Sequence, residues 1–350
     1  MRAEPVSGPV LRSLQRVCGE HGLATLGERL ANLAELVRWD MAEVEKALKH
    51  VRGSERDVHQ AAHHLLRTGG KRLRPICVAL GARMGTGFSD AARELGVAVE
   101  LVHCATLLHD DVVDQGDTRR GVAAARTVYG NAASIFAGDY LLIDALKRVR
   151  RVGVPGALER LLDIIDEMIA AESIQLESRG QIETSAERYF QIVEGKTAAL
   201  FRWAMFAGAR SGGLDDAASR RLEEYGRHLG MAFQLVDDLL DYVGDESKTG
   251  KALYADLREG KMTYPLLLAR DRDERVRGIL ELALENDAEL TDAARTLLRN
   301  ALEETGALHD TRELALRHAD DATAVLTTFD TGPARTALET VAEACVRRER

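Results

Sequence analysis

Cysteine, proline and aromatic residues are all scarce in this 350-residue chain, and each scarcity excludes a class of protein. The four cysteines are scattered without a Cys-x-x-Cys pair, which argues against a disulfide framework and a zinc site. Six prolines and 5% aromatic residues leave few helix breakers and little strand-forming composition. No apolar run approaches the roughly 18–20 residues that a membrane-spanning helix needs. The first thirty residues mix arginines with glutamates, so neither a signal peptide nor a transit peptide is expected.

An excess of positive charge is also lacking, because 47 Lys+Arg stand against 56 Asp+Glu, a formal net charge of −9. An acidic chain repels a phosphate backbone unless its basic residues are concentrated, so no nucleic-acid partner is expected. Hydrophobic residues make up 45% of the chain, which is enough to build a core and excludes disorder as the dominant state. These features predict a reduced, cytoplasmic, globular protein.

Good helix formers, chiefly Ala, Leu, Glu and Arg, dominate what is present. Apolar residues recur at helical spacing in four long segments: Leu30–Val51, Asp90–Val113, Gly156–Glu177 and Leu222–Tyr242. Short Gly, Ser and Asp clusters separate such segments, and no linker marks a domain boundary. The sequence therefore predicts one all-α domain over residues 26–350, preceded by a variable or flexible extension over residues 1–25.

One pattern of aspartates occurs twice, at the C-terminal ends of two predicted helices: Asp110, Asp111 and Asp114, then Asp237, Asp238 and Asp241. Residues four apart share a helix face, where like charges destabilise the helix by about 0.2–0.5 kcal/mol per pair. Carboxylates that project from an apolar stretch need a cation. Oxygen ligands suit Mg²⁺, which typically takes one or two carboxylates plus phosphates and water.

Two other interpretations of the acidic clusters were weighed. A single cluster would often be a solvated helix end, but two with identical spacing favour a shared interior cavity over a solvated groove. Glu100-x-x-His103 has the spacing of a di-iron ligand pair, yet such bundles need a second Glu-x-x-His, and the sequence has none. Glu100 and His103 instead extend the polar stripe that leads to Asp110 and Asp114.

Basic residues gather near the acidic clusters, although each alone is more often a surface charge. Gly70, Lys71 and Arg74 stand before a predicted helix start, where backbone N–H groups and arginine favour a phosphate. Further cations follow at Arg119, Arg120, Lys196, Lys251 and Lys261. Magnesium-binding carboxylates interleaved with phosphate-binding cations describe a pyrophosphate site.

Seven motifs in order make the chain, from about residue 40 onward, resemble the trans-prenyl diphosphate synthases, or polyprenyl synthetases. They are Gly70-Lys71-Arg72-Leu73-Arg74-Pro75, Leu107 to Asp114, Arg119-Arg120-Gly121, Gly138-Asp139, Lys196-Thr197, Phe233 to Asp241, and Asp256-Leu257-x-x-Gly260-Lys261. The bacterial octaprenyl-type enzymes are the most similar. The resemblance implies the isoprenoid synthase fold, a helical bundle around a central cavity, and a homodimer. It also implies head-to-tail condensation of isopentenyl diphosphate onto an allylic prenyl diphosphate.

The resemblance also implies a role for each matched residue. Asp110, Asp114 and Asp237 would coordinate Mg²⁺, with Asp111, Asp238 and Asp241 in support. The allylic diphosphate would be held by Arg119, Lys196 and Lys251. Isopentenyl diphosphate would be held by the loop of Gly70 and Lys71, with Arg74, His103 and Arg120. Thr197 and Gln234 would stabilise positive charge on the reacting carbons, and Lys261 would be a further substrate-binding cation.

Product length depends, by the same resemblance, on the residues just before Asp110. Ala105 and Thr106 stand where aromatic residues would stop growth at farnesyl length, and the next turn offers Val102 and Leu101. A long product is therefore expected, with geranylgeranyl diphosphate synthesis as the alternative. A class I terpene cyclase is less expected because the second Asp-Asp-x-x-Asp motif is complete. A non-catalytic partner subunit is less expected because both clusters are intact. Membrane contact would be transient, during product release.

Overall fold

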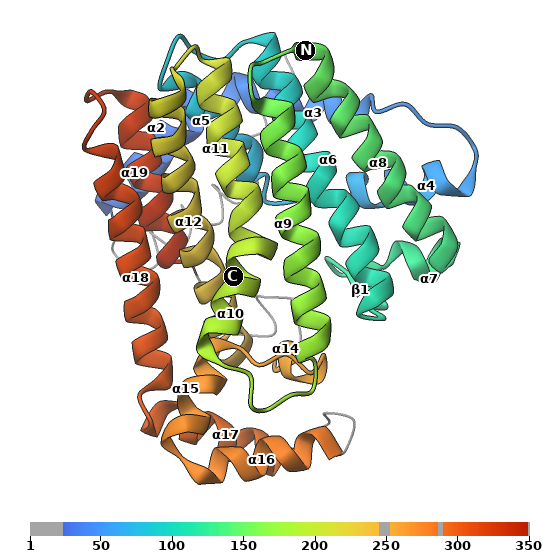
Figure 1. The fold of residues 1–350 in the computed structure, drawn as a ribbon, viewed down its shortest axis with the longest axis vertical. Helices are drawn as coiled ribbons and strands as arrows, with labels where there is room; N and C mark the ends of the chain where they lie inside the picture. The colour runs from blue at the N-terminus through green and yellow to red at the C-terminus, as the bar shows by residue number, and fades with distance from the viewer. Residues whose placement is uncertain (1–23, 245–252, 286–289, 349–350) are drawn as a thin grey trace. The chain divides into compact units, whose positions relative to one another are not determined.

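The computed structural model describes residues 24–244, 253–285 and 290–348. Helices form almost all of the regular structure in these residues, and the all-α prediction is confirmed (Figure 1). The chain divides into two compact units, each with its own buried residues. Unit 1 comprises Met1–Leu162, Leu200–Gly226 and Val325–Val341, and unit 2 comprises Asp163–Ala199, Arg227–Ala324 and Ala342–Arg350.

The elements that begin in unit 1 include a small hairpin between the helices. They are α2 (Ala24–Leu36), α3 (Arg38–Lys49), α4 (Asp57–Arg67), α5 (Leu73–Arg83), α6 (Asp90–Val113), β1 (Thr118–Arg119), β2 (Val122–Ala123), α7 (Ala125–Tyr129), α8 (Asn131–Val152), α9 (Ala157–Ser178), α12 (Asp216–Val243) and α19 (Pro333–Val346). The predicted segment Asp90–Val113 coincides with α6, whose first turn is capped by the Ser89 side chain. The segment Leu30–Val51 is divided at Val37, although backbone hydrogen bonds on both sides of Val37 continue the helical path.

Helix α6 lies at the centre of unit 1, where it packs against α5 and α8. Helix α5 is buried from Pro75 to Ala82, so this helix is apolar on all sides rather than amphipathic. The Gly-rich clusters at residues 85–87 and 211–213, two of those expected to separate helices, lie side by side, because the Thr86 amide and hydroxyl both donate to the Gly212 carbonyl, at 2.8 and 3.1 Å. These contacts join the loop before α6 to the loop after α11.

The elements that begin in unit 2 are all helical. They are α10 (Ala186–Val193), the π-helical turn η1 (Glu194–Ala198), α11 (Ala199–Ser211), α14 (Ala255–Arg258), α15 (Tyr264–Arg272), α16 (Glu274–Glu285), α17 (Asp292–Glu304) and α18 (Ala307–Leu326). Tyr189 stacks on Tyr264 with ring centroids 5.7 Å apart, and Tyr242 hydrogen-bonds Thr263 at 2.6 Å. These buried contacts hold α10 and the 254–264 segment beside the end of α12.

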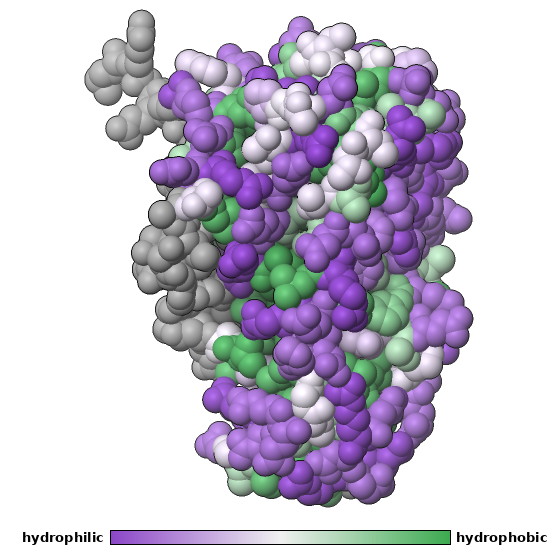
Figure 2. Space-filling view, turned by 90° about the vertical axis from the view of Figure 1, so that its left-hand side faces the viewer, coloured by the Kyte–Doolittle hydropathy of each residue, from purple (hydrophilic) through white to green (hydrophobic). Residues whose placement is uncertain are grey.

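Among the described residues, no helix combines the length and the apolar character that a bilayer crossing demands. The face in Figure 2 is mainly hydrophilic, with hydrophobic residues in small separate patches.

Candidate active site

The first aspartate cluster lies at the C-terminal end of α6, in unit 1. The Asp114 amide donates to the Asp110 carbonyl at 2.8 Å, so the helical register continues through the last aspartate. Asp110 and Asp114 are half-buried, whereas the Asp111 side chain is 1% exposed. The helix therefore presents Asp110 and Asp114 at its surface and directs Asp111 inward, as the four-residue spacing predicts.

The inward-facing Asp111 binds Arg119. Both Nε and Nη2 of Arg119 donate to Asp111 Oδ1, at 2.8 and 2.5 Å. Burial raises the pKa of Asp111, and the Arg119 guanidinium opposes this rise. The carboxylate thus orients the arginine at the end of α6, and the supporting role of Asp111 at a metal site stays a prediction.

Arg119 and Arg120 owe their positions to the β1–β2 hairpin, which the sequence analysis did not predict. Arg119 pairs with Val122, and the two residues between them, Arg120 and Gly121, both have positive φ. Positive φ at both central residues is the signature of a type I′ hairpin turn, which favours glycine at its second position. Strands of two residues are too short to show an alternating pattern.

Four of the residues predicted to hold isopentenyl diphosphate come together in unit 1. A Cβ added to Gly70 would lie 3.0 Å from Arg120 Nη2, so the loop backbone passes against that guanidinium. Arg74 lies over the Phe201 ring, 4.5 Å from its centroid. Burial, followed by the charges of Arg74 and Arg120, lowers the pKa of His103 well below its ordinary value. Lys71 is exposed in the same loop as Gly70.

Glu100, the first member of the polar stripe that leads to Asp110, is buried inside unit 1 and bound by an arginine. Its buried carboxylate pairs with the buried Arg72, whose Nε also donates to Glu45 at 2.6 Å. Arg72 has a φ of 54° and stands directly before α5. This ion-pair cluster fixes the loop that carries Gly70 and Lys71, and it occupies the carboxylate that the di-iron interpretation required.

A close contact explains the Gly138-Asp139 motif. A Cβ on Gly138 would lie 2.3 Å from His109 Nε2, which is far too close for any side chain. His109 in turn hydrogen-bonds the Ile135 carbonyl at 3.1 Å and precedes Asp110 in α6. The glycine therefore allows α8 to pack directly against the end of α6.

The second aspartate cluster lies in α12, in unit 2, and its three members have different partners. Asp237 is 40% exposed and forms an ion pair with Arg348, with 2.7 Å between Oδ1 and Nη1. Asp238 is buried and accepts hydrogen bonds from Tyr189 at 2.5 Å and Gln234 at 2.8 Å. Asp241 accepts the backbone N–H of Ala255 at 2.9 Å and so anchors the start of α14.

A chain of hydrogen bonds links Thr197 and Gln234, the residues predicted to face the reacting carbons, to Asp238. The Thr197 hydroxyl donates to Gln234 Oε1 at 2.8 Å, and Gln234 Nε2 donates to Asp238. Burial raises the pKa of Asp238 well above its ordinary value, and the neighbouring Asp256 carboxylate adds to the rise. The network fixes the orientation of the Gln234 amide, which a lone glutamine side chain would not keep.

Lys196 and Thr197 project from η1, the π-helical turn between α10 and α11. Such turns break the regular side-chain spacing of a helix and are frequent at functional sites. Lys196 Nζ pairs with Glu172 of α9 at 2.5 Å. Lys196 and Thr197 line a cavity of about 130 Å³ in unit 2, together with Gln234, Asp256 and Lys261. Lys261 forms an ion pair with Glu259. Lys251 lies outside the described residues.

Three residues of this half were missed by the sequence analysis. Tyr189 and Glu172 are single residues of amphipathic helices, and no local pattern distinguishes them from others. Arg348 is separated from Asp237 by more than a hundred residues, so only the folded chain brings the two together. The two aspartate clusters belong to different units, and the cavity that both were expected to share therefore stays a prediction.

The model of one known family, described as polyprenyl synthetase, matches residues 55–301. The chain belongs to the polyprenyl synthetase family. This polyprenyl synthetase is 37% identical to the octaprenyl diphosphate synthase of Escherichia coli (strain K12) over 241 residues, 69% of this chain and 75% of the relative. It is 36% identical to heptaprenyl diphosphate synthase component 2 of Geobacillus stearothermophilus over 242 residues, again 69% and 75%.

A solved structure is similar over nearly the whole chain. The polyprenyl synthase from Caulobacter crescentus CB15, complexed with calcium and isoprenyl diphosphate, is 39% identical with a TM-score of 0.86. The match covers 91% of this polyprenyl synthetase and 98% of that chain. The predicted family, isoprenoid synthase fold and enzyme class, a prenyltransferase that elongates trans chains, are thereby confirmed. Membership also brings the two substrates of the family, isopentenyl and allylic diphosphates, and a divalent metal.

Proposed function

We propose that this polyprenyl synthetase uses Mg²⁺ to build a long all-trans polyprenyl diphosphate, releasing pyrophosphate at each condensation. One observation carries the proposal: in both aspartate clusters the second aspartate is buried and bound by protein side chains. Arg119 binds Asp111, and Tyr189 with Gln234 binds Asp238. Each cluster thus keeps its first aspartate, Asp110 or Asp237, at the surface of its helix.

The donor set fits a hard divalent cation. Asp110 and Asp114 of unit 1 and Asp237 of unit 2 would supply the carboxylates, and Mg²⁺ prefers such oxygen ligands together with phosphate oxygens and water. When bound, the ion supplies charge neutralisation for a departing diphosphate without any proton transfer.

The chain's own cations hold the two substrates. Arg119, fixed by Asp111, and Lys196, fixed by Glu172, bind the allylic diphosphate oxygens. Lys251 is proposed for the same diphosphate. The group formed by the Gly70–Lys71 loop, Arg74, His103 and Arg120 binds isopentenyl diphosphate, and bidentate guanidinium contacts suit its oxygens. His103 takes part as a neutral N–H donor because its pKa is lowered.

The bond-forming step depends on the side chains that face the reacting carbons. Loss of the allylic diphosphate leaves positive charge that the oriented oxygen dipoles of Thr197 and Gln234 stabilise. The double bond of isopentenyl diphosphate attacks this carbon, and a proton is then lost to the released pyrophosphate. Apolar neighbours in the unit 2 cavity, among them Ile192, Val193 and Met262, reduce access of water to the cation. We assign Lys261, at the same cavity, to substrate binding.

The residues before Asp110 support a long product. Ala105 is 2% exposed and has the smallest side chain that the turn could carry, and Leu101 and Val102 are buried one turn earlier. Thr106 turns its hydroxyl to the His103 carbonyl. Arg148 of α8 is a basic residue that would be unfavourable beside an apolar product. Its guanidinium is neutralised by ion pairs with Glu94 and Asp144, at 2.7 and 2.9 Å. The octaprenyl and heptaprenyl relatives agree with this assignment over a geranylgeranyl product.

We further propose a homodimer that works in the cytoplasm and touches a membrane only as product leaves. Helix α8 exposes Ile135, Phe136 and Ile143, and an apolar groove of unit 1 continues from Ile143 to Leu158 and Leu162. Phe136→Glu should convert dimers to monomers in light scattering after size exclusion, whereas unchanged mass would refute this face. The name of the heptaprenyl relative, component 2, makes an enzyme of two different chains the second candidate. Inactivity of the purified chain alone would favour this candidate.

Paired substitutions test the metal assignment. Asp110→Asn and Asp237→Asn should each lower turnover by at least about 100-fold, the scale of losing one charge-stabilising group. Asp216→Asn, an exposed aspartate in the first turn of α12, is the matched control and should keep full activity. Circular dichroism should be the same for all. Near-normal turnover of either cluster variant would contradict the proposal.

A further inference from the structure

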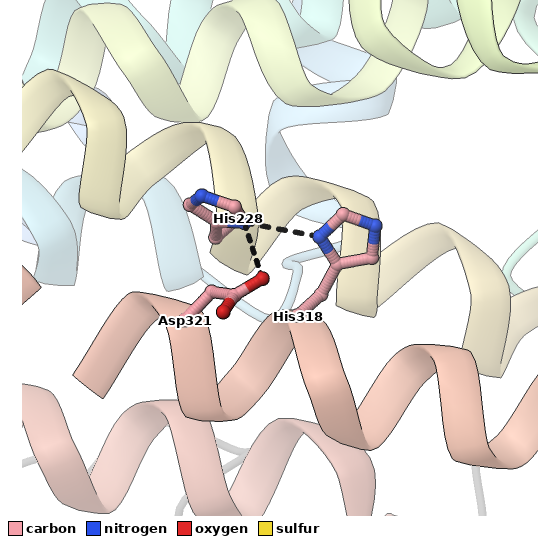
Figure 3. A group of neighbouring side chains, drawn as sticks. All are labelled: His228, His318 and Asp321. Carbon is pink, nitrogen blue, oxygen red and sulfur yellow. Dashed lines mark hydrogen bonds and ion pairs between the residues drawn. The ribbon is translucent and has the colours of Figure 1, made fainter. Parts of the chain in front are cut away.

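Two histidines and an aspartate meet in unit 2 on a face that the proposed reaction does not use. His228 comes from α12, and His318 and Asp321 come from α18, ninety residues later (Figure 3). The two Nδ1 atoms are 3.0 Å apart, and His228 Nδ1 lies 3.7 Å from Asp321 Oδ2. All three candidate ligand atoms lie within 4.8 Å of one another.

We propose that His228, His318 and Asp321 form a binding site for a divalent transition metal of the zinc class. In a tetrahedral site with metal–ligand distances of about 2.0–2.1 Å, neighbouring ligand atoms are about 3.3 Å apart. The observed 3.0 and 3.7 Å bracket that separation, so small side-chain rotations would complete the geometry. Two imidazoles and a carboxylate, with water in the fourth position, are a recurrent zinc donor set and are softer than the ligands Mg²⁺ prefers.

The surroundings of His318 disfavour its protonated form, which could not bind a metal. Burial, and then the charges of His228 and Arg227, lower the pKa of His318 to about 4. The ring-to-ring hydrogen bond requires a proton on one Nδ1, and metal binding moves that proton to the Nε2 of the same ring. His228 is 14% exposed and Asp321 59% exposed, so the carboxylate side opens to solvent and a metal can enter there.

The charges around the site come from both helices and from η1. Arg227 of α12 is paired with Glu194 at 2.8 Å, and Arg317 of α18 is exposed. Asp321 supplies a negative charge 3.7 Å from His228 Nδ1, and the proposal takes it as the third ligand. A bound metal would join α18 to α12, the helix whose next turns carry Asp237.

Cobalt titration of the full-length protein tests the site. The protein is stripped with chelator and then given Mg²⁺ in large excess, so that the aspartate clusters hold a hard cation. Co²⁺ should produce the visible absorption of a tetrahedral nitrogen-containing site with one equivalent, and Zn²⁺ should abolish it. His318→Ala and His228→Ala should lower the affinity by more than the roughly 10- to 100-fold typical of second-shell changes.

Two further variants separate ligand loss from misfolding. His309→Ala removes an exposed imidazole from α18 and should leave the cobalt spectrum unchanged. Asp321→Asn alters an exposed side chain that the fold does not need, and it should weaken Co²⁺ binding at least tenfold. No tetrahedral spectrum in the unaltered protein, or the same affinity in His318→Ala and Asp321→Asn, would show that the two rings share only a hydrogen bond and would overturn the proposal.

Discussion

Gly195 offers a sharp test of how η1 sets the positions of Lys196 and Thr197. A Cβ added at this position would lie 2.6 Å from the Ala171 Cβ and 2.9 Å from the Glu167 carbonyl oxygen, both in α9. Carbon atoms in good contact are about 3.5–4.0 Å apart, so η1 must move away from α9 by about 1 Å. The Glu167 carbonyl belongs to a helix backbone and cannot yield.

The cost of Gly195→Ala follows from these distances. Overpacking of this kind costs about 1–3 kcal/mol, and the gain in helix propensity from alanine returns up to about 1 kcal/mol. A net destabilisation of about 1–2 kcal/mol is therefore expected. Catalysis should suffer more, because a 1 Å displacement of a positioned group can cost about 100-fold. The Thr197–Gln234 hydrogen bond is 2.8 Å long, and lengthening it by about 1 Å would break it.

Urea unfolding and steady-state kinetics measure the two effects separately. Gly278→Ala is the matched control, because nothing lies within 4 Å of the Cβ it would add in α16. The control should gain about 0.5–1 kcal/mol of stability and keep its kinetics. Full activity of Gly195→Ala would refute the argument that η1 positions the site, even if the protein were destabilised.

Three further perturbations follow from the described contacts. Ala105→Phe should shorten the product, because a buried aromatic ring would close the path beside α6, and chromatography of dephosphorylated products measures it. His103→Gln should make the free energy of unfolding depend less on pH below pH 7. Folded His103 stays neutral where the unfolded chain gains a proton below pH 6.5, so unfolding free energy falls by up to about 1 kcal/mol between pH 7 and 5.5. Arg348→Ala should lower the Mg²⁺ concentration for half-maximal activity several-fold, because the guanidinium competes for Asp237.

Each of these has its own contrary result. An unchanged product distribution in Ala105→Phe would refute the direction of chain growth, and Ala105→Val should shorten the product less. Equal pH slopes for His103→Gln and the unaltered protein would show that His103 titrates normally. A higher Mg²⁺ requirement in Arg348→Ala would mean that the arginine assists the site, and Arg347→Ala, exposed and paired with Glu343, is the control.

How far the sequence predicts this molecule depends on the range of each interaction. The α6 boundaries were predicted correctly because the helical spacing of apolar residues over Asp90–Val113 is a local signal. Helix spacing also predicted which of Asp110, Asp111 and Asp114 would share a surface.

Long-range pairing accounts for what was missed. The ion pair of Glu100 was not predicted, because its partner Arg72 comes from another segment with a left-handed backbone. The extra residue per turn in η1 has no recognisable sequence signature, and neither does the return of Arg348 to Asp237. These features arise from tertiary packing, which overrides local propensity.

Product analysis tests the central claim most directly. The purified chain is incubated with farnesyl diphosphate, labelled isopentenyl diphosphate and Mg²⁺, and the dephosphorylated products are resolved by length. We predict a ladder that ends well beyond the geranylgeranyl product. A ladder that stops at geranylgeranyl would contradict the long-chain assignment, and no incorporation with any allylic primer or divalent metal would contradict autonomous chain elongation by this protein.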